Sequence, residues 1–313
     1  MKNLGPGDVV LVTGGSGSLA RALIPQILTA GVDELRILSR DEVKQGEIHT
    51  LYPNVRCILG DVRDLRACKE AVRGATIVLH AASLKFIDVS ELQPTEYVLT
   101  NVLGTINMIQ AVTQEGGVDR MIGISTDKVA NAINTYGLTK ALLEKLFMES
   151  HTHRKRTGTT FVVCRYGNVI ASRGSVLLKW AEARKTDAPL LVTDPTMTRF
   201  FFTLDEAVDL IDLALVQESG VIVSKAMSST TLGELAEVMA GPAGVRIIGR
   251  RPGEKVHEDL LSELEMPRVI RQEGFFFYRP LSTPHETTEP AYTSFTARRL
   301  TPDELMELTE PWR

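Results

Sequence analysis

Short apolar runs rich in β-branched residues alternate with amphipathic stretches through the first half of the chain. The runs predict buried strands at residues 9–13, 35–39, 55–59, 76–80 and 120–125. Apolar positions at helical spacing predict helices at residues 18–30, 43–51, 64–72 and 94–113. Strands that alternate with helices form parallel βαβ units, and their right-handed crossovers build a doubly wound sheet. We therefore expect a Rossmann-like α/β fold.

The same alternation continues to about residue 166 and then changes. A helix is predicted at residues 136–149, a solvated basic turn at 151–157 and a strand at 161–165. Beyond Gly167 the loops lengthen and prolines become frequent, with aromatic strands expected at 200–202 and 275–278. A surface loop at 282–290 and a last helix at 302–308, capped by Thr301, complete the chain. We expect a first domain over residues 1–166 and a smaller region over 167–313, interleaved with the sheet.

Composition narrows the class of protein. The 313 residues are 43% hydrophobic and 24% charged, which suffices for a large core. The net charge is −4 without a basic tract, which argues against a nucleic-acid partner. Neither a membrane-spanning run nor a signal-peptide core is present, so we expect no membrane partner. Three scattered cysteines predict reduced thiols, no metal site and a cytoplasmic location.

A glycine-rich loop joins the first predicted strand to the first predicted helix. Residues 11–20 read LVTGGSGSLA, so Gly14 permits a tight turn and Gly17 lets a pyrophosphate approach a helix N-terminus. Such a pattern is weak alone, but its place between strand and helix is the one that a dinucleotide-binding loop requires. Ser16, Ser18 and Leu19 complete the predicted contacts.

The end of the second strand selects the cofactor. Ser39 and Arg40 suit the 2′-phosphate of NADP, because a guanidinium binds phosphate oxygens in a planar fork. In the alternative, Arg40 is a surface cation and Asp41 holds the ribose of NAD. Asp61, after the third strand, either accepts from the adenine amino group or caps the next helix.

A tyrosine and a lysine follow the fifth strand at helical spacing. Tyr136 and Lys140 are four residues apart, so they share a helix face, and the cation favours the phenolate. A phenolate near neutral pH accepts a proton from a sugar hydroxyl while hydride leaves to a nicotinamide. Asp127 and Lys128 lie just before them in the sequence, either as an acid–base pair or as an ordinary salt bridge.

Ten segments in order along the chain carry a family resemblance. They are SRDEVKQ (39–45), GDVRD (60–64), HAASLK (80–85), TNVLGT (100–105), STDK (125–128), YGLTK (136–140), RYGNV (165–169), SRGSV (172–176), TDPTMTRF (193–200) and RPGEK (251–255). The chain resembles the extended short-chain dehydrogenases/reductases. More narrowly, it is similar to the UDP-N-acetylglucosamine 4,6-dehydratases of the polysaccharide biosynthesis protein family.

This resemblance implies an NADP-dependent, redox-neutral dehydration of UDP-N-acetylglucosamine to a UDP-4-keto-6-deoxy sugar. Tyr136 would oxidise at C4, within a catalytic set that also includes Thr126 and Lys140. Lys128 would remove the C5 proton, which requires a lowered pKa, and Asp127 would protonate the leaving 6-hydroxyl, which requires a raised pKa. Tyrosine at position 136 points, by resemblance, to the branch that inverts C5.

The resemblance also implies the binding residues and a homo-oligomer. Besides the glycine loop, the expected cofactor contacts are Ser39, Arg40, Asp41, Lys44, Asp61, Val62, Ala81, Ala82, Lys85, Thr100, Tyr136, Lys140 and Val169. The expected substrate contacts are Lys85, Asn168, Ser172, Arg173, Gly174, Ser175, Val176, Thr193 and Met197. Arg199 and Arg251 would clamp the diphosphate, and Glu254 would accept from the uridine ribose.

Other functions remain open at this point. Ser83, Phe86, Asp88 and Phe295 depart from the family pattern around the sugar pocket. A dehydratase that retains C5 would use the same groups. A UDP-hexosamine 4-epimerase needs Tyr136 and Lys140 but has no use for Asp127 and Lys128 as acid and base. A non-catalytic NADP-binding regulator is the distant alternative. Such proteins typically lose the tyrosine or the lysine, whereas this chain has both Tyr136 and Lys140.

Overall fold

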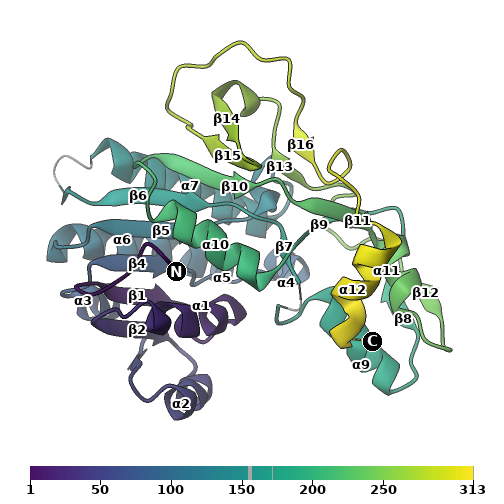
Figure 1. Cartoon of the computed structure of the whole chain (residues 1–313), viewed down its shortest axis with the longest axis horizontal. Coiled ribbons are helices and arrows are strands. Elements are labelled where there is room, and N and C mark those ends of the chain that lie inside the picture. The colour runs from purple at the N-terminus through teal and green to yellow at the C-terminus, as the bar shows by residue number, and fades with distance from the viewer. Residues whose placement is uncertain (154–156, 171, 313) are drawn as a thin grey trace.

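A large, mostly parallel sheet forms the body of the molecule in the computed structural model, which describes residues 1–153, 157–170 and 172–312 (Figure 1). Its strands lie in the order β14-β15-β10-β6-β5-β4-β1-β2-β3. Strands β3 to β10 of this order pair in parallel, while β10–β15 and β15–β14 pair antiparallel. The expected Rossmann-like α/β fold is confirmed.

The first half of the chain supplies six strands of this sheet and the helices between them. The first elements are β1 (Val9–Thr13), α1 (Ser18–Thr29), β2 (Glu34–Ser39), α2 (Glu42–Leu51), β3 (Arg56–Leu59), α3 (Leu65–Val72) and β4 (Ile77–His80). They are followed by α4 (Ile87–Leu92), α5 (Pro94–Tyr97), the π-helical η1 (Val98–Leu103), α6 (Gly104–Glu115), β5 (Arg120–Ile124), the 3-10 turn η2 (Asp127–Val129), α7 (Thr135–Thr152) and β6 (Thr160–Cys164). Residues of β1, β4, β5 and β6 are almost all buried, as expected for strands that are covered on both faces.

Three details of this half differ from the sequence expectation. The helix expected at 94–113 divides into α5, η1 and α6, because the π-helical turn widens the backbone where Asn101 is held inward. Helix α7 continues to Thr152, so His151 lies in the helix, and residues 154–156 of the expected basic turn lie outside the described residues. Asp64, not Asp61, caps α3.

The second half both extends the sheet and builds a smaller lobe. Its elements are β7 (Asn168–Val169), α9 (Val176–Lys185), β8 (Leu190–Val192), β9 (Thr198–Phe202), α10 (Leu204–Ala214), β10 (Val221–Lys225), β11 (Ser228–Thr231), α11 (Leu232–Met239), β12 (Val245–Ile247), β13 (Asp259–Leu261), η3 (Met266–Arg268), β14 (Val269–Gln272), β15 (Phe275–Tyr278), β16 (Tyr292–Thr293), α12 (Pro302–Thr309) and η4 (Glu310–Trp312). Strands β10, β14 and β15 join the main sheet. As expected, Thr301 caps α12, in a reciprocal capping box with Glu304.

Two apolar cores hold these layers together. The main core lies on both faces of the sheet, with α1 and α10 packed side by side on one face and α3, α6 and α7 on the other (Figure 1). The second core joins α9, α11 and α12 around Trp180, Leu235 and Leu305, and we call this part the C-terminal lobe. Within the described ranges, no helix is long and apolar enough to cross a membrane, and no group of metal-ligating side chains gathers.

Candidate active site

A cavity of about 1080 Å³ opens at the carboxyl ends of β1, β2, β4 and β5 and extends to the C-terminal lobe. Strand β1 lies between β2 and β4, so the order of strands reverses at this point. Ligands of open parallel sheets bind at such a reversal, outside the carboxyl ends of the strands. The cavity lining runs from the glycine loop to Arg251 and Glu254, so residues from both halves of the sequence meet around it.

The glycine loop is packed too closely for side chains. Gly14 has a φ of +67°, and a Cβ there would lie 2.9 Å from the backbone of Ala82. At Gly15 a Cβ would lie 2.3 Å from the Cβ of Ile37. Helix α1 starts after Gly17 without a side-chain cap among the described residues, and its first residues line the cavity. This is the shape and the donor set that a dinucleotide pyrophosphate requires.

The polar end of this region contains Ser39, Arg40 and Asp61. Ser39 Oγ lies 2.7 Å from Ser16 Oγ, and Arg40 Nη1 lies 3.4 Å from Asp61 Oδ2. Asp41 instead caps α2, where its carboxylate accepts from the backbone N–H of Lys44 and pairs with the Lys44 ammonium. Arg40 and Asp41 therefore both have ionic partners in this structure, Asp61 for Arg40 and Lys44 for Asp41.

Asp61 is not the helix cap that the sequence allowed. Its carboxylate accepts from the backbone N–H of Arg63 at 3.0 Å and from Nε of Arg63 at 2.8 Å, and the helix cap falls to Asp64. Burial acts to raise the pKa of Asp61, but the hydrogen bonds from Arg63 and the charge of Arg40 lower it. Asp61 is thus an ionised anchor for two arginines at the cavity edge.

The expected acid–base pair is formed and buried at η2. Lys128 Nζ lies 2.8 Å from Asp127 Oδ1, 3.4 Å from Asn168 Oδ1 and 3.5 Å from Oε1 of Glu258. Thr126 Oγ1 donates to Asp127 Oδ1 at 3.0 Å. Lys128 and Thr126 line the cavity, whereas Asp127 is not among the described residues that do. Asp127 therefore lies behind Lys128, seen from the cavity.

The pKa of Asp127 is shifted in the predicted direction, and the pKa of Lys128 is shifted in the opposite one. Burial and the nearby Glu258 carboxylate raise the pKa of Asp127 against the pull of Lys128, as an acid requires. Burial acts to lower the pKa of Lys128, but the charges of Asp127 and Glu258 outweigh it and raise that pKa. The expected depression at Lys128 is therefore wrong for the protein alone, since two carboxylates surround the ammonium.

Tyr136 and Lys140 lie on α7 and both line the cavity. Asn134 caps this helix by accepting from the N–H of Gly137 at 2.7 Å. Burial raises the pKa of Tyr136, while a hydrogen bond with Thr126 and the charge of Lys128 oppose the rise. The sequence predicts Lys140, and not Lys128, as the residue that favours the phenolate. Burial lowers the pKa of Lys140 to about 7, against the attraction of Glu144.

A buried network of charged side chains includes Glu144 of α7. Arg165 donates through Nε and Nη2 to Glu144 at 2.9 and 2.6 Å, and through Nη1 and Nη2 to Glu265 at 3.0 and 2.8 Å. Ser125 Oγ donates to Glu144 Oε1 at 2.6 Å. Glu144 lies one turn after Lys140, and its charge is balanced by Arg165.

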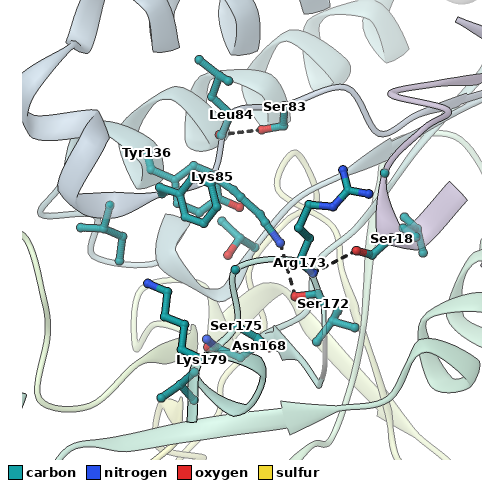
Figure 2. A pocket seen from close by; sticks show the side chains of 18 of the residues that line it. Ser18, Ser83, Leu84, Lys85, Tyr136, Asn168, Ser172, Arg173, Ser175 and Lys179 are labelled. Atoms are coloured by element: carbon teal, nitrogen blue, oxygen red, sulfur yellow. Dashed lines mark hydrogen bonds between the residues drawn. The ribbon is translucent and has the colours of Figure 1, made fainter. Parts of the chain in front are cut away.

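Two loops meet across the cavity mouth (Figure 2). Lys85 Nζ donates to Ser172 Oγ at 3.3 Å, and the backbone N–H of Arg173 donates to Ser18 Oγ at 3.0 Å. A Cβ at Gly174 would lie 2.4 Å from the ring of Phe86, so the two loops pack closely. These contacts place the glycine loop, the 83–86 loop and the 172–175 loop around one volume, as Figure 2 shows.

The predicted substrate residues divide into two groups. Eleven of them line the cavity, namely Lys85, Asn168, Ser172, Arg173, Gly174, Ser175, Val176, Thr193, Arg199, Arg251 and Glu254. Met197 is fully buried in the second core and is not among the described lining residues, because its side chain fills space beside Trp180 and Leu235.

Arg199 reaches the cavity but is directed into the protein. Its Nη1 donates to the carbonyls of Thr198 and Val256, its Nη2 donates to the carbonyl of Lys255, and its Nε lies 3.7 Å from Oε1 of Glu258. The expected bidentate grip on a phosphate is therefore not available to it. Arg251, 45% exposed, pairs with Glu254 and Asp88 at the mouth.

Sequence reasoning missed Glu258. The carboxylate comes from the segment before β13, is 1% exposed and lies beside Lys128 and Arg199. It follows the RPGEK segment by three residues, and a lone glutamate next to a histidine carries no spacing that would mark it.

Comparisons with known proteins agree with this geometry. A family model described as "Polysaccharide biosynthesis protein" matches residues 10–280. A UDP-glucose 4-epimerase of Rickettsia felis is 37% identical over 278 residues, which is 85% of this chain and 81% of the relative. A protein of Methanocaldococcus jannaschii described as an uncharacterized membrane protein is 37% identical over 285 residues, which is 87% of this chain and 85% of the relative.

Solved structures show the same architecture. The X-ray structure of Pen from Bacillus thuringiensis is 28% identical, covers 97% of both chains and superposes with a TM-score of 0.93. A dTDP-glucose 4,6-dehydratase of Streptomyces venezuelae, solved with NAD, is 21% identical, covers 79% of this chain and 86% of its own, and has a TM-score of 0.72. At this level of identity, the similarity to the dehydratase shows a shared fold alone.

Proposed function

Because the chain belongs to the polysaccharide biosynthesis protein family, we propose that it is a nicotinamide-dependent enzyme that modifies a nucleotide sugar. The specific reaction that we propose is an NADP-dependent, redox-neutral 4,6-dehydration of a UDP-hexosamine such as UDP-N-acetylglucosamine, with inversion at C5. Relatives named as nucleotide-sugar epimerases and a structural neighbour named as a dehydratase support the general class.

The cofactor cradle supports the first part of this proposal. Gly14 and Gly15 let the loop pack against Ala82 and Ile37, where a Cβ would overlap protein atoms, and the start of α1 presents backbone N–H groups to the pyrophosphate. Ser39 and Arg40 would hold the 2′-phosphate. When bound, the nicotinamide supplies a reversible hydride acceptor for C4 of the sugar.

One observation carries the dehydration: Lys128, which is paired with Asp127, lines the same cavity as Tyr136. Tyr136 takes the proton of the 4-hydroxyl, which is all the acid–base work that an epimerase needs. A 4-ketone acidifies the C5 proton, and elimination then needs a base at C5 and an acid at the 6-hydroxyl. Lys128 and Asp127 supply both.

Transfer of one proton over the 2.8 Å from Lys128 Nζ to Asp127 Oδ1 gives both required forms, a neutral amine and a carboxylic acid. The amine takes the C5 proton, the C6–O bond breaks, and the acid gives its proton to the departing hydroxyl, which leaves as water. The pair returns to ammonium and carboxylate. The hydride taken from C4 would then return to C6 and a proton would add at C5, which gives the methyl group and makes the reaction redox-neutral. Gly167 lines the cavity, and a Cβ there would lie 3.0 Å from the buried Asp127 Oδ2, so a larger side chain at this position would press on the acid.

Proton NMR in deuterium oxide tests the proposal. Incubation with UDP-N-acetylglucosamine and NADP should give a new methyl signal, deuterium at C5 and the L-arabino coupling pattern. Lys128→Met and Tyr136→Phe should remove the methyl signal, while Lys185→Met, at an exposed position on α9, should keep it. A D-xylo pattern would refute inversion only. No methyl from any UDP-sugar in a panel would refute the dehydration.

A 4-epimerase is the second candidate, because the Rickettsia relatives bear that name. In that case Asp127 and Lys128 form a structural salt bridge, and Lys128→Met would keep activity that Tyr136→Phe removes. The product would be UDP-N-acetylgalactosamine, or UDP-galactose from UDP-glucose, without a methyl signal.

A further inference from the structure

Glu258 is a buried carboxylate that the proposed reaction does not use. It is 1% exposed, and its Oε1 lies 3.5 Å from Lys128 Nζ and 3.7 Å from Arg199 Nε. Its Oε2 is buried without a hydrogen-bond partner in the described part of the chain. A buried carboxylate oxygen without a partner is costly, so its retention calls for an explanation.

The second such oxygen belongs to the other carboxylate that contacts the same lysine. Asp127 Oδ2 is also buried without a partner among the described residues, while Asp127 Oδ1 holds Lys128. Lys128 thus contacts two carboxylates, one from η2 and one from a segment about 130 positions later. Burial acts to raise the pKa of both carboxyl groups. The two are still unequal, because the charges of Lys128, Arg199 and Lys255 lower the pKa of Glu258, whereas at Asp127 the charge of Glu258 adds to the effect of burial.

We propose that Glu258 is a positioning residue of this active site: it holds Lys128 at the cavity wall and confines the mobile proton to the Asp127–Lys128 pair. Its own proton affinity is lowered, since Lys128, Arg199 and Lys255 offset its burial and lower its pKa. A proton that leaves Lys128 therefore goes to Asp127 and not to Glu258. This role rests on the proposed dehydration, but the charge arrangement exists without substrate.

The charged groups around Glu258 determine in which direction the pKa of Lys128 should change. They are Asp127 and Lys128 on η2, Arg199 on β9, Lys255 on the same segment and Tyr136 on α7, on which Glu258 also acts. Glu258→Gln removes a negative charge from this group and keeps the shape. Lys128 loses an attraction and Asp127 loses a repulsion, so the pKa values of both fall. A change of about one to three pH units is typical for a charge at this distance.

The experiment follows Lys128 directly by NMR of protein labelled with ¹³C at lysine Cε, with Lys128→Met to assign the signal. In the unaltered protein the Lys128 signal should titrate above the ordinary lysine range. In Glu258→Gln its midpoint should fall by about one to three pH units. Glu265→Gln is the matched control, because Glu265 is a buried carboxylate that pairs with Arg165 and not with Lys128, and it should leave the midpoint in place.

An unchanged midpoint in folded Glu258→Gln would overturn the inference, as would an equal fall in Glu265→Gln. Should Glu258→Gln fail to fold, Glu258→Asp retains the charge at a greater distance and should lower the midpoint by less than one unit; a larger fall there would also refute the role. In turnover, both limbs of the pH profile for C5 deuterium exchange should move to lower pH. A merely structural role would reduce the rate without moving them.

The two proposals fail separately. The titration needs no substrate, so a shifted Lys128 midpoint in a protein that dehydrates no UDP-sugar would confirm the effect of Glu258 on Lys128 and refute the proposed function. Dehydration of a UDP-sugar together with an unchanged Lys128 midpoint in Glu258→Gln would support the proposed function and refute the role of Glu258.

Discussion

Arg165→Met should be severely destabilising, because it leaves two buried carboxylates without their cation. Arg165 is 1% exposed and donates to Glu144, to Glu265 and to the carbonyl of Leu260. Removal of one partner from a buried pair costs about 3–5 kcal/mol, since the remaining charge keeps its desolvation penalty. At about 2 °C per kcal/mol for a chain of this size, Tm should fall by about 6–10 °C.

The loss should also depend on pH with a defined sign. Burial acts to raise the pKa of Glu265, but Arg165 lowers it below its usual value. Glu265 therefore stabilises the fold above its unfolded pKa and loses this contribution as pH falls through its folded pKa. In Arg165→Met only the hydrogen bonds from Ser262 still oppose the effect of burial, so Glu265 takes up a proton more readily. The stability deficit of the variant should shrink as pH falls from about 8 to about 5.

Urea unfolding at several pH values measures both effects. Glu144→Gln and Glu265→Gln, added to Arg165→Met, remove the uncompensated charges and should recover more than half of the loss. The reasoning is refuted if Arg165→Met alone lies within about 1 kcal/mol of the unaltered protein, or if the deficit grows as the pH falls. The variant should also raise the pKa of Lys140, because Glu144 would then attract that lysine without competition from Arg165.

Three further variants test the cofactor cradle. Gly15→Ala should destabilise the protein by about 1–3 kcal/mol and weaken dinucleotide binding, since its Cβ would overlap Ile37; unchanged Tm and affinity would contradict this packing. Arg40→Ala should weaken NADP binding at least tenfold in a fluorescence titration and leave NAD binding within twofold; equal losses would count against the 2′-phosphate role. Asn101→Ala removes hydrogen bonds to Leu84 at 2.8 and 3.0 Å, so it should lower stability by about 1–3 kcal/mol and raise proteolysis of the 83–86 loop; unaltered cleavage would show that Asn101 does not hold the loop.

The sheet was predictable because buried parallel strands leave a strong apolar signal. Residues 9–13 were expected as a strand and form β1, and the expected helix at 64–72 differs from α3 by a single residue at its start. The division of 94–113 was not predictable, because the π-helical turn depends on Asn101 and its contacts with the distant Leu84 and Thr139. Tertiary contacts of this kind override local helical preference.

The site was predictable where a motif is local and not where it is assembled across the chain. Thr126, Lys128, Tyr136 and Lys140 come from neighbouring segments and line one cavity. Glu258 reaches that place only through the fold, and its charge adds to that of Asp127 in raising the pKa of Lys128. Arg199 lies in a local motif but does not act as that motif predicted. Its guanidinium donates to the carbonyls of Thr198 and Lys255, and no sequence pattern indicates these contacts.

The path of the chain limits how the cavity opens. After β6 in the main sheet the chain enters the C-terminal lobe, returns at α10 and β10, leaves again at β11 and α11, and comes back at β14 and β15 before α12 ends in the lobe (Figure 1). A swinging motion of the lobe would have to bend all of these connections together. We therefore expect the lobe and the sheet to melt in one calorimetric transition, and ligands to enter by rearrangement of the 83–86 and 172–175 loops. Small-angle scattering profiles with and without nucleotide sugar should then superimpose.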